Sequence, residues 1–208
     1  MKKFLLVDDH VVVRAGIKLL LSQIFKPCEV HEAGDGDSAI EKIKLEPFDL
    51  ILMDIQMPNT DTLGIMEYIQ IKFPDTKVLI FSMSAENIYA KRFLRAGAKG
   101  FVSKDSSLNE ITKAINIVLD NRNYISTKLA DILVGESFSN KITNPFDQLS
   151  NRELEIVSLL LSGQGVSEIS RSLNLQVSTI ATHKARLFEK LNITNILELK
   201  ELATFYNL

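Results

Sequence analysis

The first 120 residues of this sequence repeat one pattern five times: a short apolar run followed by a longer segment with helical spacing. The apolar runs lie at residues 4–7, 29–32, 49–53, 78–81 and 100–102. The helical segments lie at residues 13–25, 37–45, 62–72, 86–96 and 108–119. This alternation predicts a parallel sheet with helices on both faces, because parallel strands are joined by crossover helices. We therefore expect an α/β domain with a flavodoxin-like, doubly wound, five-stranded parallel sheet.

The strand signal ends after about residue 123. Residues 123–134 have the spacing of a short helix, and residues 135–148 have the Gly, Ser, Asn, Thr and Pro content of a linker. Four further helical segments lie at residues 151–162, 166–173, 177–191 and 195–206. Ser150 and Glu153 have the spacing of a capping box at the start of the first of these. We predict three parts: a domain at 1–122, a helical extension and linker at 123–147, and a small all-α domain at 148–208.

Composition narrows the class of protein. Hydrophobic residues make up 46% and charged residues 24%, as in ordinary globular proteins, and a net charge of −2 gives no sign of a nucleic-acid partner. The single cysteine, Cys28, forms no internal disulfide and fits a reducing compartment. Asp8 ends the first apolar run too early for a secretory signal, and no stretch reaches the ~20 apolar residues that span a membrane. We expect a cytoplasmic protein.

Polar side chains stand at the ends of four of the predicted strands. Asp8 and Asp9 follow the first strand, Asp54 the third, Ser82 the fourth and Lys104 the fifth. Ligands of doubly wound sheets bind beyond the carboxyl ends of the strands, so we expect these side chains to meet there. A single acidic residue after a strand is more often a helix cap, but the joint pattern is more specific. Three clustered carboxylates need a cation, and oxygen ligands favour Mg²⁺ over zinc.

These residues resemble the receiver domain of two-component response regulators over about residues 3–121. The motifs are Val7-Asp8-Asp9-His10, Met53-Asp54-Ile55-Gln56-Met57-Pro58, Ser82 and Gly100-Phe101-Val102-Ser103-Lys104. The resemblance implies that Asp54 accepts a phosphoryl group from a sensor histidine kinase. It implies that Asp8 or Asp9, Asp54 and the main-chain carbonyl of Gln56 hold Mg²⁺. Ser82 and Lys104 would contact the phosphoryl group.

Phe101 has two interpretations within this resemblance, and Thr62 departs from the family pattern. Phe101 is implied to swing inward as Ser82 moves, although a core aromatic of its strand is an equally good interpretation. Thr62 follows Asp61 where receivers usually carry glycine. Because a β-branched residue disfavours the backbone conformations that glycine serves, we expect the loop after Asp54 to be reshaped.

The segment at 177–191 predicts an amphipathic helix. At 100° per residue, Ile180, Leu187 and Leu191 share one face, and small or polar residues lie opposite. A short helix at 166–173 precedes it across the turn Asn174-Leu175-Gln176. This arrangement matches a helix-turn-helix, whose second helix enters the major groove of DNA. Spacing alone fits a plain helical hairpin equally well. The charge does not decide between them, because residues 178–190 carry a net charge of only +2, from three Lys or Arg against one Glu.

Residues 148–208 resemble the LuxR-type DNA-binding domain. The motifs are Leu149-Ser150-Asn151-Arg152-Glu153, the stretch 163–169, Ser178-Thr179-Ile180-Ala181-Thr182-His183 and Lys190-Leu191. Together with a receiver this is the NarL/FixJ class, which implies binding of double-stranded DNA and a homodimer on activation. The implied DNA contacts are Ser178, Thr179, Thr182, His183, Lys184, Arg186, Lys190 and Asn195. Ala181 and Ile196 replace cationic residues usual in the family, so we expect weaker nonspecific affinity and greater reliance on dimerisation.

Three alternatives stay open from the sequence. A phosphatase also uses an aspartate nucleophile with Mg²⁺, but Gln56 stands where such enzymes usually place a second acid. A flavodoxin-like cofactor domain needs a phosphate-binding loop after the first strand, where Asp8 and Asp9 would repel phosphate. In the third alternative the C-terminal helices bind a protein instead of DNA. We predict a phosphorylation-controlled transcription regulator and not an enzyme.

Overall fold

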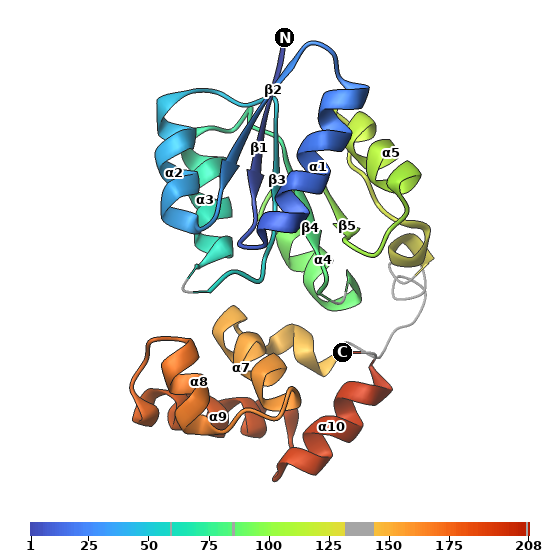
Figure 1. Ribbon diagram of the computed structural model, residues 1–208. Helices are drawn as coiled ribbons and strands as arrows, with labels where there is room; N and C mark the ends of the chain where they lie inside the picture. The colour runs from blue at the N-terminus through green and yellow to red at the C-terminus, as the bar shows by residue number, and fades with distance from the viewer. Residues whose placement is uncertain (59, 85, 132–143, 207) are drawn as a thin grey trace. The chain divides into compact units, whose positions relative to one another are not determined.

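The computed structural model divides into two compact units, Met1–Asp131 and Ile132–Leu208 (Figure 1). The structure describes residues 1–58, 60–84, 86–131, 144–206 and 208. Of the helix predicted at 123–134, residues 127–131 are helical. Residues 123–126 are not, because the backbone of Tyr124 pairs with the sheet in a β-bridge, so the prediction is wrong there. Residues 132–134 lie outside the described residues. The domain boundaries expected at residues 122 and 147 therefore stay a prediction.

The first unit is a five-stranded, all-parallel sheet in the order β2-β1-β3-β4-β5. The strands are β1 (Lys2–Val7), β2 (Cys28–Ala33), β3 (Leu50–Met53), β4 (Val78–Ser82) and β5 (Gly100–Ser103). The helices are α1 (Val11–Ile24), α2 (Gly36–Leu45), α3 (Thr62–Lys72), α4 (Glu86–Arg95) and α5 (Leu108–Leu119). This order is that of a flavodoxin-like sheet, so the predicted fold is confirmed. The strand order reverses at β1 and β3, which places the ligand-binding edge of the sheet beside them.

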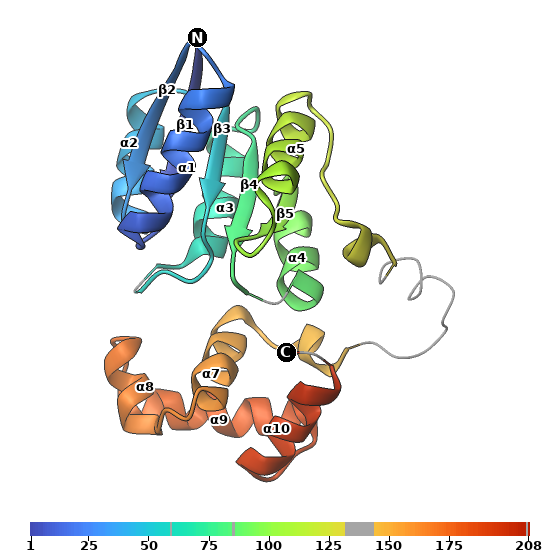
Figure 2. The same cartoon turned by 45° about the vertical axis from the view of Figure 1, so that its right-hand side comes forward.

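Both faces of the sheet are covered by helices. Helices α1 and α5 lie over one face, and α2, α3 and α4 lie over the other (Figure 2). On the first face, Phe4 and Leu6 of β1 share a core with Leu21 of α1 and Ile115 of α5. Every residue of β3 is buried, as its continuous apolar run predicted. Strand β2 lies at the edge of the sheet, and only its last residue, Ala33, is buried. This position explains why the apolar pattern of β2 in the sequence is less pronounced than that of β3.

The chain returns to the sheet after α5 at Tyr124. The backbone amide of Tyr124 donates to the carbonyl of Lys99 at 2.8 Å, and its hydroxyl donates to Glu110 at 2.6 Å. Tyr124 also forms a β-bridge with Gly100 and is 2% exposed. A Cβ on Gly100 would lie 2.9 Å from both the Cβ and the carbonyl oxygen of Tyr124. The close approach of the two backbones therefore requires glycine at this position.

We expect Gly100→Ala to destabilise the first unit by about 1–3 kcal/mol, because the added methyl overpacks a site bounded by backbone. Urea unfolding of the full chain measures this loss. The matched control is Gly16→Ala on α1, where an added Cβ meets no atom within 4 Å. That substitution should be neutral or stabilising, because alanine has the higher helix propensity. Equal unfolding free energies for Gly100→Ala and the native chain would contradict the close approach.

The second unit is a small all-α domain. Its elements are the 3₁₀ helix η1 (Pro145–Gln148) and the helices α7 (Asn151–Leu161), α8 (Val166–Ser172), α9 (Val177–Leu191) and α10 (Ile196–Phe205). The four predicted helices are confirmed. Residues 145–148, which composition assigned to the linker, instead form η1, and Phe146 within it is fully buried. The sequence did not indicate this helix, because the residues around Phe146 are polar and typical of a linker. The Phe146 side chain nevertheless belongs to the core and anchors η1 to it.

The start of α7 is a capping box, as the spacing predicted. Ser150 Oγ accepts from the amide of Glu153 at 3.3 Å, and the Glu153 carboxylate accepts from the amide of Ser150 at 2.7 Å. The same carboxylate binds Lys190 Nζ of α9 at 2.7 Å. Burial alone would raise the pKa of Glu153, but Lys190 and the bonds with Ser150 outweigh it and hold that pKa below its ordinary value. Glu153 therefore joins the first helix of this unit to the end of α9.

Acid should weaken this junction. The contribution of Glu153 is complete above its unfolded pKa of about 4.5 and is lost as the pH falls through the lowered folded pKa. We expect Glu153→Gln to lower the thermal stability near neutral pH, and we expect this deficit to shrink as the pH falls below 4.5. Circular dichroism melts of both chains measure the difference. The control is Glu155→Gln, whose carboxylate lies on the same helix but is 41% exposed; a deficit that is independent of pH would contradict the assignment.

Candidate functional site

Side chains from four strand ends meet at the carboxyl edge of the sheet. Asp8 follows β1, Asp54 follows β3, Ser82 ends β4 and Lys104 follows β5. The parallel ladder continues into these residues: the amide of Asp54 donates to the Val7 carbonyl at 2.8 Å, and that of Lys104 to the Ser82 carbonyl at 3.1 Å. The structure thus brings together the residues that the strand ends predicted.

The Asp54 carboxylate is the centre of this group. It is 3% exposed. Its Oδ1 accepts from Ser82 Oγ at 2.6 Å and from the amides of Ile55 and Gln56 at 2.7 and 3.2 Å. Its Oδ2 lies 2.7 Å from Lys104 Nζ. A carboxylate oxygen held in this way is positioned to act as a nucleophile.

Lys104 lies between two acids. Its ammonium is 2.7 Å from Asp54 and 2.6 Å from Asp8, and its side chain is only 8% exposed. Burial alone would lower the pKa of Lys104, but the contacts with Asp54 and Asp8 outweigh it, so the pKa is held above its usual value. Lys104 is therefore a fixed positive charge beside Asp54.

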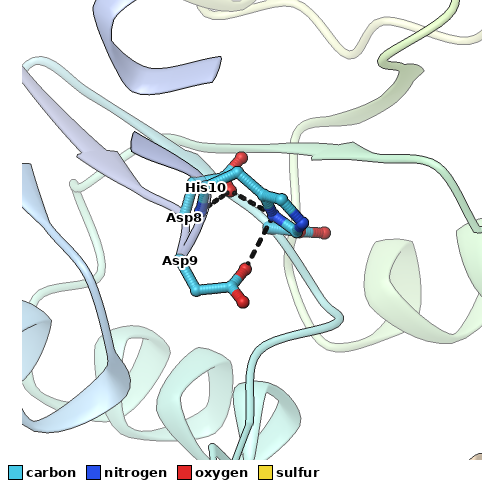
Figure 3. A group of neighbouring side chains, drawn as sticks. Asp8, Asp9 and His10 are labelled. Carbon is cyan, nitrogen blue, oxygen red and sulfur yellow. Dashed lines mark hydrogen bonds and ion pairs between the residues drawn. The ribbon is translucent and has the colours of Figure 1, made fainter. Parts of the chain in front are cut away.

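His10 joins the acidic group, and sequence reasoning missed it. Its Nδ1 lies 3.1 Å from Asp8 Oδ1 and 2.9 Å from Asp9 Oδ1, at the end of β1 (Figure 3). One donor atom from each of Asp8, Asp9, His10 and Asp54 lies within 4.8 Å of the others. The signal was its place directly after the acid pair. The guanidinium of Arg14, also missed, donates to the Asp8 carbonyl and so holds this loop against α1.

The acidic group fits a divalent cation. Asp8 Oδ2 and Asp9 Oδ1 are buried oxygens, and their nearest polar neighbours are Lys104 Nζ at 2.6 Å and His10 Nδ1 at 2.9 Å. Three carboxylates face one ammonium, which leaves negative charge uncompensated in a buried place. Burying such charge is costly unless a cation neutralises it, and carboxylate oxygens are suitable ligands for Mg²⁺.

The remaining predicted residues of this group lie around it. The Gln56 amide donates to Asp54, and its side chain is exposed. Phe101 is fully buried in β5 opposite Ile80 of β4, which suits a core aromatic and leaves its switching role a prediction. Thr62 is the first residue of α3, and Asp61 caps that helix, so the β-branched residue stands in helical backbone. The reshaped loop expected before it stays a prediction, because Asn59 lies outside the described residues.

Helices α8 and α9 form the predicted helix-turn-helix. Asn174 in the turn has a left-handed backbone with φ of 48°, and Ser170 Oγ donates to the Leu175 carbonyl at 2.6 Å. Ile180, Leu187 and Leu191 of α9 are buried, as their spacing predicted. The exposed residues on the other side include Ser178, Thr182 and Arg186, and the half-buried ones are Thr179, His183 and Lys184.

Two of the predicted DNA contacts also have structural roles. Lys190 is bound to the buried Glu153, so its positive charge is partly compensated within the domain. Asn195 caps α10, where its Oδ1 accepts from the amides of Leu197 and Glu198 at 2.9 and 3.0 Å. We therefore expect Arg186 to contribute more to DNA affinity than Lys190 does.

Two known protein families match this chain, one in each of its two units. Residues 4–116 match the response regulator receiver domain, and residues 147–203 match the bacterial regulatory proteins of the luxR family. This chain is a response regulator of the NarL/FixJ class. The regulator is 37% identical to response regulator GacA of Pseudomonas protegens over 204 residues, which cover 98% of this chain and 95% of GacA. It is 36% identical to UvrY of Escherichia coli over 205 residues, with 98% and 94% covered.

Solved structures share the fold of the regulator. RcsB of Salmonella enterica, solved with a promoter and a phosphomimetic, aligns with a TM-score of 0.71 at 23% identity over 98% of both chains. A receiver joined to a LuxR-type helix-turn-helix is the composition of DNA-binding transcription regulators, so the C-terminal helices are not favoured as a protein-binding module. The family is one of regulators and not of classical enzymes. Among the described helices, none is long and apolar enough to cross a membrane.

Proposed function

We propose that this regulator accepts a phosphoryl group on Asp54 from a sensor histidine kinase and that phosphorylation increases its dimerisation and DNA binding. One observation carries the proposal: the buried Asp54 carboxylate is held between the Ser82 hydroxyl and the Lys104 ammonium, beside an acidic group that fits a cation. A carboxylate in such a place is a nucleophile with its charge partners already positioned.

Phosphoryl transfer to Asp54 requires only small displacements of the side chains around it. A carboxylate oxygen of Asp54 attacks the phosphorus of the kinase phosphohistidine, the phosphorus–nitrogen bond breaks, and its electron pair returns to the imidazole. Mg²⁺ held by Asp8 or Asp9, Asp54 and the Gln56 carbonyl would neutralise charge on the phosphoryl oxygens. Lys104 and Ser82 already touch Asp54, so short displacements let them follow the phosphoryl group formed on it.

The switch begins at Ser82. This residue ends β4, and its shift towards the phosphoryl group moves the start of the β4–α4 connection. Phe101 of the neighbouring strand turns with it, and the surface of α4, β5 and α5 repacks. Phosphorylation thereby shifts the population between two packings of the same fold. Slow hydrolysis of the aspartyl phosphate by the regulator itself resets the switch.

The second unit supplies the output. RcsB has been solved as dimers bound to DNA, and we propose the same partner for this regulator: double-stranded DNA, bound by a homodimer in the cytoplasm. The residues that meet DNA are those named above on α9, with Asn195 at the start of α10. Ala181 and Ile196 carry no charge, so the second subunit adds phosphate contacts that one subunit lacks.

Beryllofluoride tests the whole proposal. Bound at Asp54 with Mg²⁺, it imitates the phosphoryl group without turnover. DNA ligands are first selected from a random pool with the beryllofluoride-treated regulator. We expect these ligands to bind more tightly with beryllofluoride than without it, in parallel with a shift from monomer to dimer in analytical ultracentrifugation. Equal DNA affinity in the two states would overturn the proposed switch.

Arg186→Ala tests the DNA-binding face. We expect a loss of about 1–3 kcal/mol in binding free energy if Arg186 meets a base, or a salt slope reduced by about one unit if it meets a phosphate. Fluorescence anisotropy at several salt concentrations separates these cases. The matched control is Arg122→Ala, which removes an exposed arginine of the first unit. Equal losses for the two variants would show that Arg186 acts only through net charge.

A further inference from the structure

A second group of metal-ligand side chains lies at the opposite end of the sheet. Glu29 and His31 stand two residues apart on β2, so their side chains share one face of the strand. Glu46 is the C-cap residue of α2, which packs on the same strand. One donor atom from each of Glu29, His31 and Glu46 lies within 4.8 Å of the others. We call these three residues the β2 cluster.

The imidazole of the β2 cluster is held in place. His31 Nε2 lies 2.8 Å from Glu29 Oε1, and its Nδ1 lies 3.3 Å from Glu46 Oε1. Its ring stands edge-on to Phe48, with centroids 5.3 Å apart and an interplanar angle of 72°. The His31 side chain is 23% exposed, so an ion can reach it while its orientation is restricted.

The β2 cluster already binds a cationic side chain. The Lys3 ammonium binds Glu46 and lies 3.8 Å from Glu29 Oε2. The contact with Glu46 raises the pKa of Lys3, and the same contact lowers the pKa of Glu46. Two carboxylates against one ammonium leave a net negative charge when the imidazole is neutral. Lys3 reaches this place on a flexible stem and is 33% exposed, so it is free to turn into solvent.

We propose that the β2 cluster is a second metal site, which takes a Zn²⁺-like divalent ion in exchange for the Lys3 ammonium. One imidazole nitrogen with two carboxylate oxygens is a donor set that suits Zn²⁺ and not Mg²⁺, and the fourth position is left to water. The site is separate from the acidic group at Asp54. Lys3 pairs with Glu29 in the sheet register and precedes Asp8 by five residues, or roughly 16 Å along the strand.

The ion would tie the edge strand β2 to the end of α2. Because only the folded chain assembles the three ligands, bound metal stabilises the first unit by an amount that rises with the logarithm of the metal concentration above the dissociation constant. Metal binding at the β2 cluster does not depend on phosphorylation of Asp54.

The test is calorimetric titration of Zn²⁺ alone into the full chain with excess Mg²⁺ present. A His10→Ala background removes the histidine of the other acidic group. We expect His31→Ala and Glu46→Gln each to weaken Zn²⁺ binding by about tenfold or more. Lys3→Met should tighten it, because the competing ammonium is gone; a gain of affinity is not explained by misfolding. His183→Ala, which removes the remaining histidine, should leave the affinity unchanged.

Two results would overturn the proposal. One is the absence of Zn²⁺ binding by the background chain. The other is Zn²⁺ affinity that His31→Ala leaves intact and Asp9→Asn abolishes, which would assign the ion to the acidic group at Asp54. Circular dichroism of each variant shows that the fold is retained.

Discussion

Asp54→Asn is expected to abolish phosphoryl uptake. Asparagine keeps the size of the side chain and can still bond to Ser82, but its amide is not a nucleophile at neutral pH. In the described part of the chain, Asp54 is the carboxylate that touches both Ser82 and Lys104. Incubation with acetyl phosphate and Mg²⁺, followed by intact-mass spectrometry, should show one added phosphoryl group on the native chain and none on the variant.

The matched control is Asp105→Asn. This carboxylate follows Lys104 directly but is exposed and lies outside the acidic group. The control should take up a phosphoryl group as the native chain does. Beryllofluoride should likewise tighten DNA binding by the control and leave Asp54→Asn unchanged. A stable phosphoryl group on Asp8 or Asp9 in the Asp54→Asn chain would show that the acceptor has been assigned to the wrong carboxylate.

Phe146→Ala should have the largest effect on stability. The Phe146 ring is fully buried and meets the Tyr206 ring edge-on at 6.3 Å. Truncation of a buried phenylalanine costs about 3–5 kcal/mol. A small unit of this kind has a stability of roughly 0.05–0.15 kcal/mol per residue, so the loss is comparable to its whole free energy of unfolding. We therefore expect the second unit of Phe146→Ala to be largely unfolded and DNA binding to be lost.

Phe205→Ala is the control for this loss. Phe205 is 74% exposed on α10, so the same truncation should change stability by only about 0.5 kcal/mol. Thermal unfolding by circular dichroism compares the variants, and limited proteolysis shows which unit has opened. Phosphoryl uptake by Phe146→Ala should continue, because Asp54 belongs to the other unit. Similar melting of the two phenylalanine variants would contradict the anchoring role of η1.

The site residues were predictable because a parallel sheet has a simple rule. All five strands run the same way, so a polar residue that ends one apolar run lies beside one that ends the next. This rule alone predicted that four side chains converge, before any interatomic distance was known: Asp8, Asp54, Ser82 and Lys104. The capping box at Ser150 was similarly readable, because both partners lie within one helical turn.

Contacts between distant parts of the chain were not predictable from the sequence in this way. His10 turns back towards the acids before it, Lys190 reaches Glu153 across two helices, and Phe146 is buried in spite of its polar neighbours. Each depends on a rotamer and on a separation of a few ångströms. Hydrophobic periodicity specifies which face of an element is buried, and it contains no information on which polar side chains meet across elements.

The sequence by itself determined the alternation of strands and helices in the first unit, the four helices α7 to α10, the edge at which the acids gather, and the buried side of α9. These follow from local periodicity and the topology of parallel sheets. Only the tertiary structure decided that Lys104 bridges Asp54 and Asp8, and that Glu29, His31 and Glu46 converge around Lys3. The physical reason is that electrostatic and metal-binding interactions act over a few ångströms, a scale that only packing of whole elements sets.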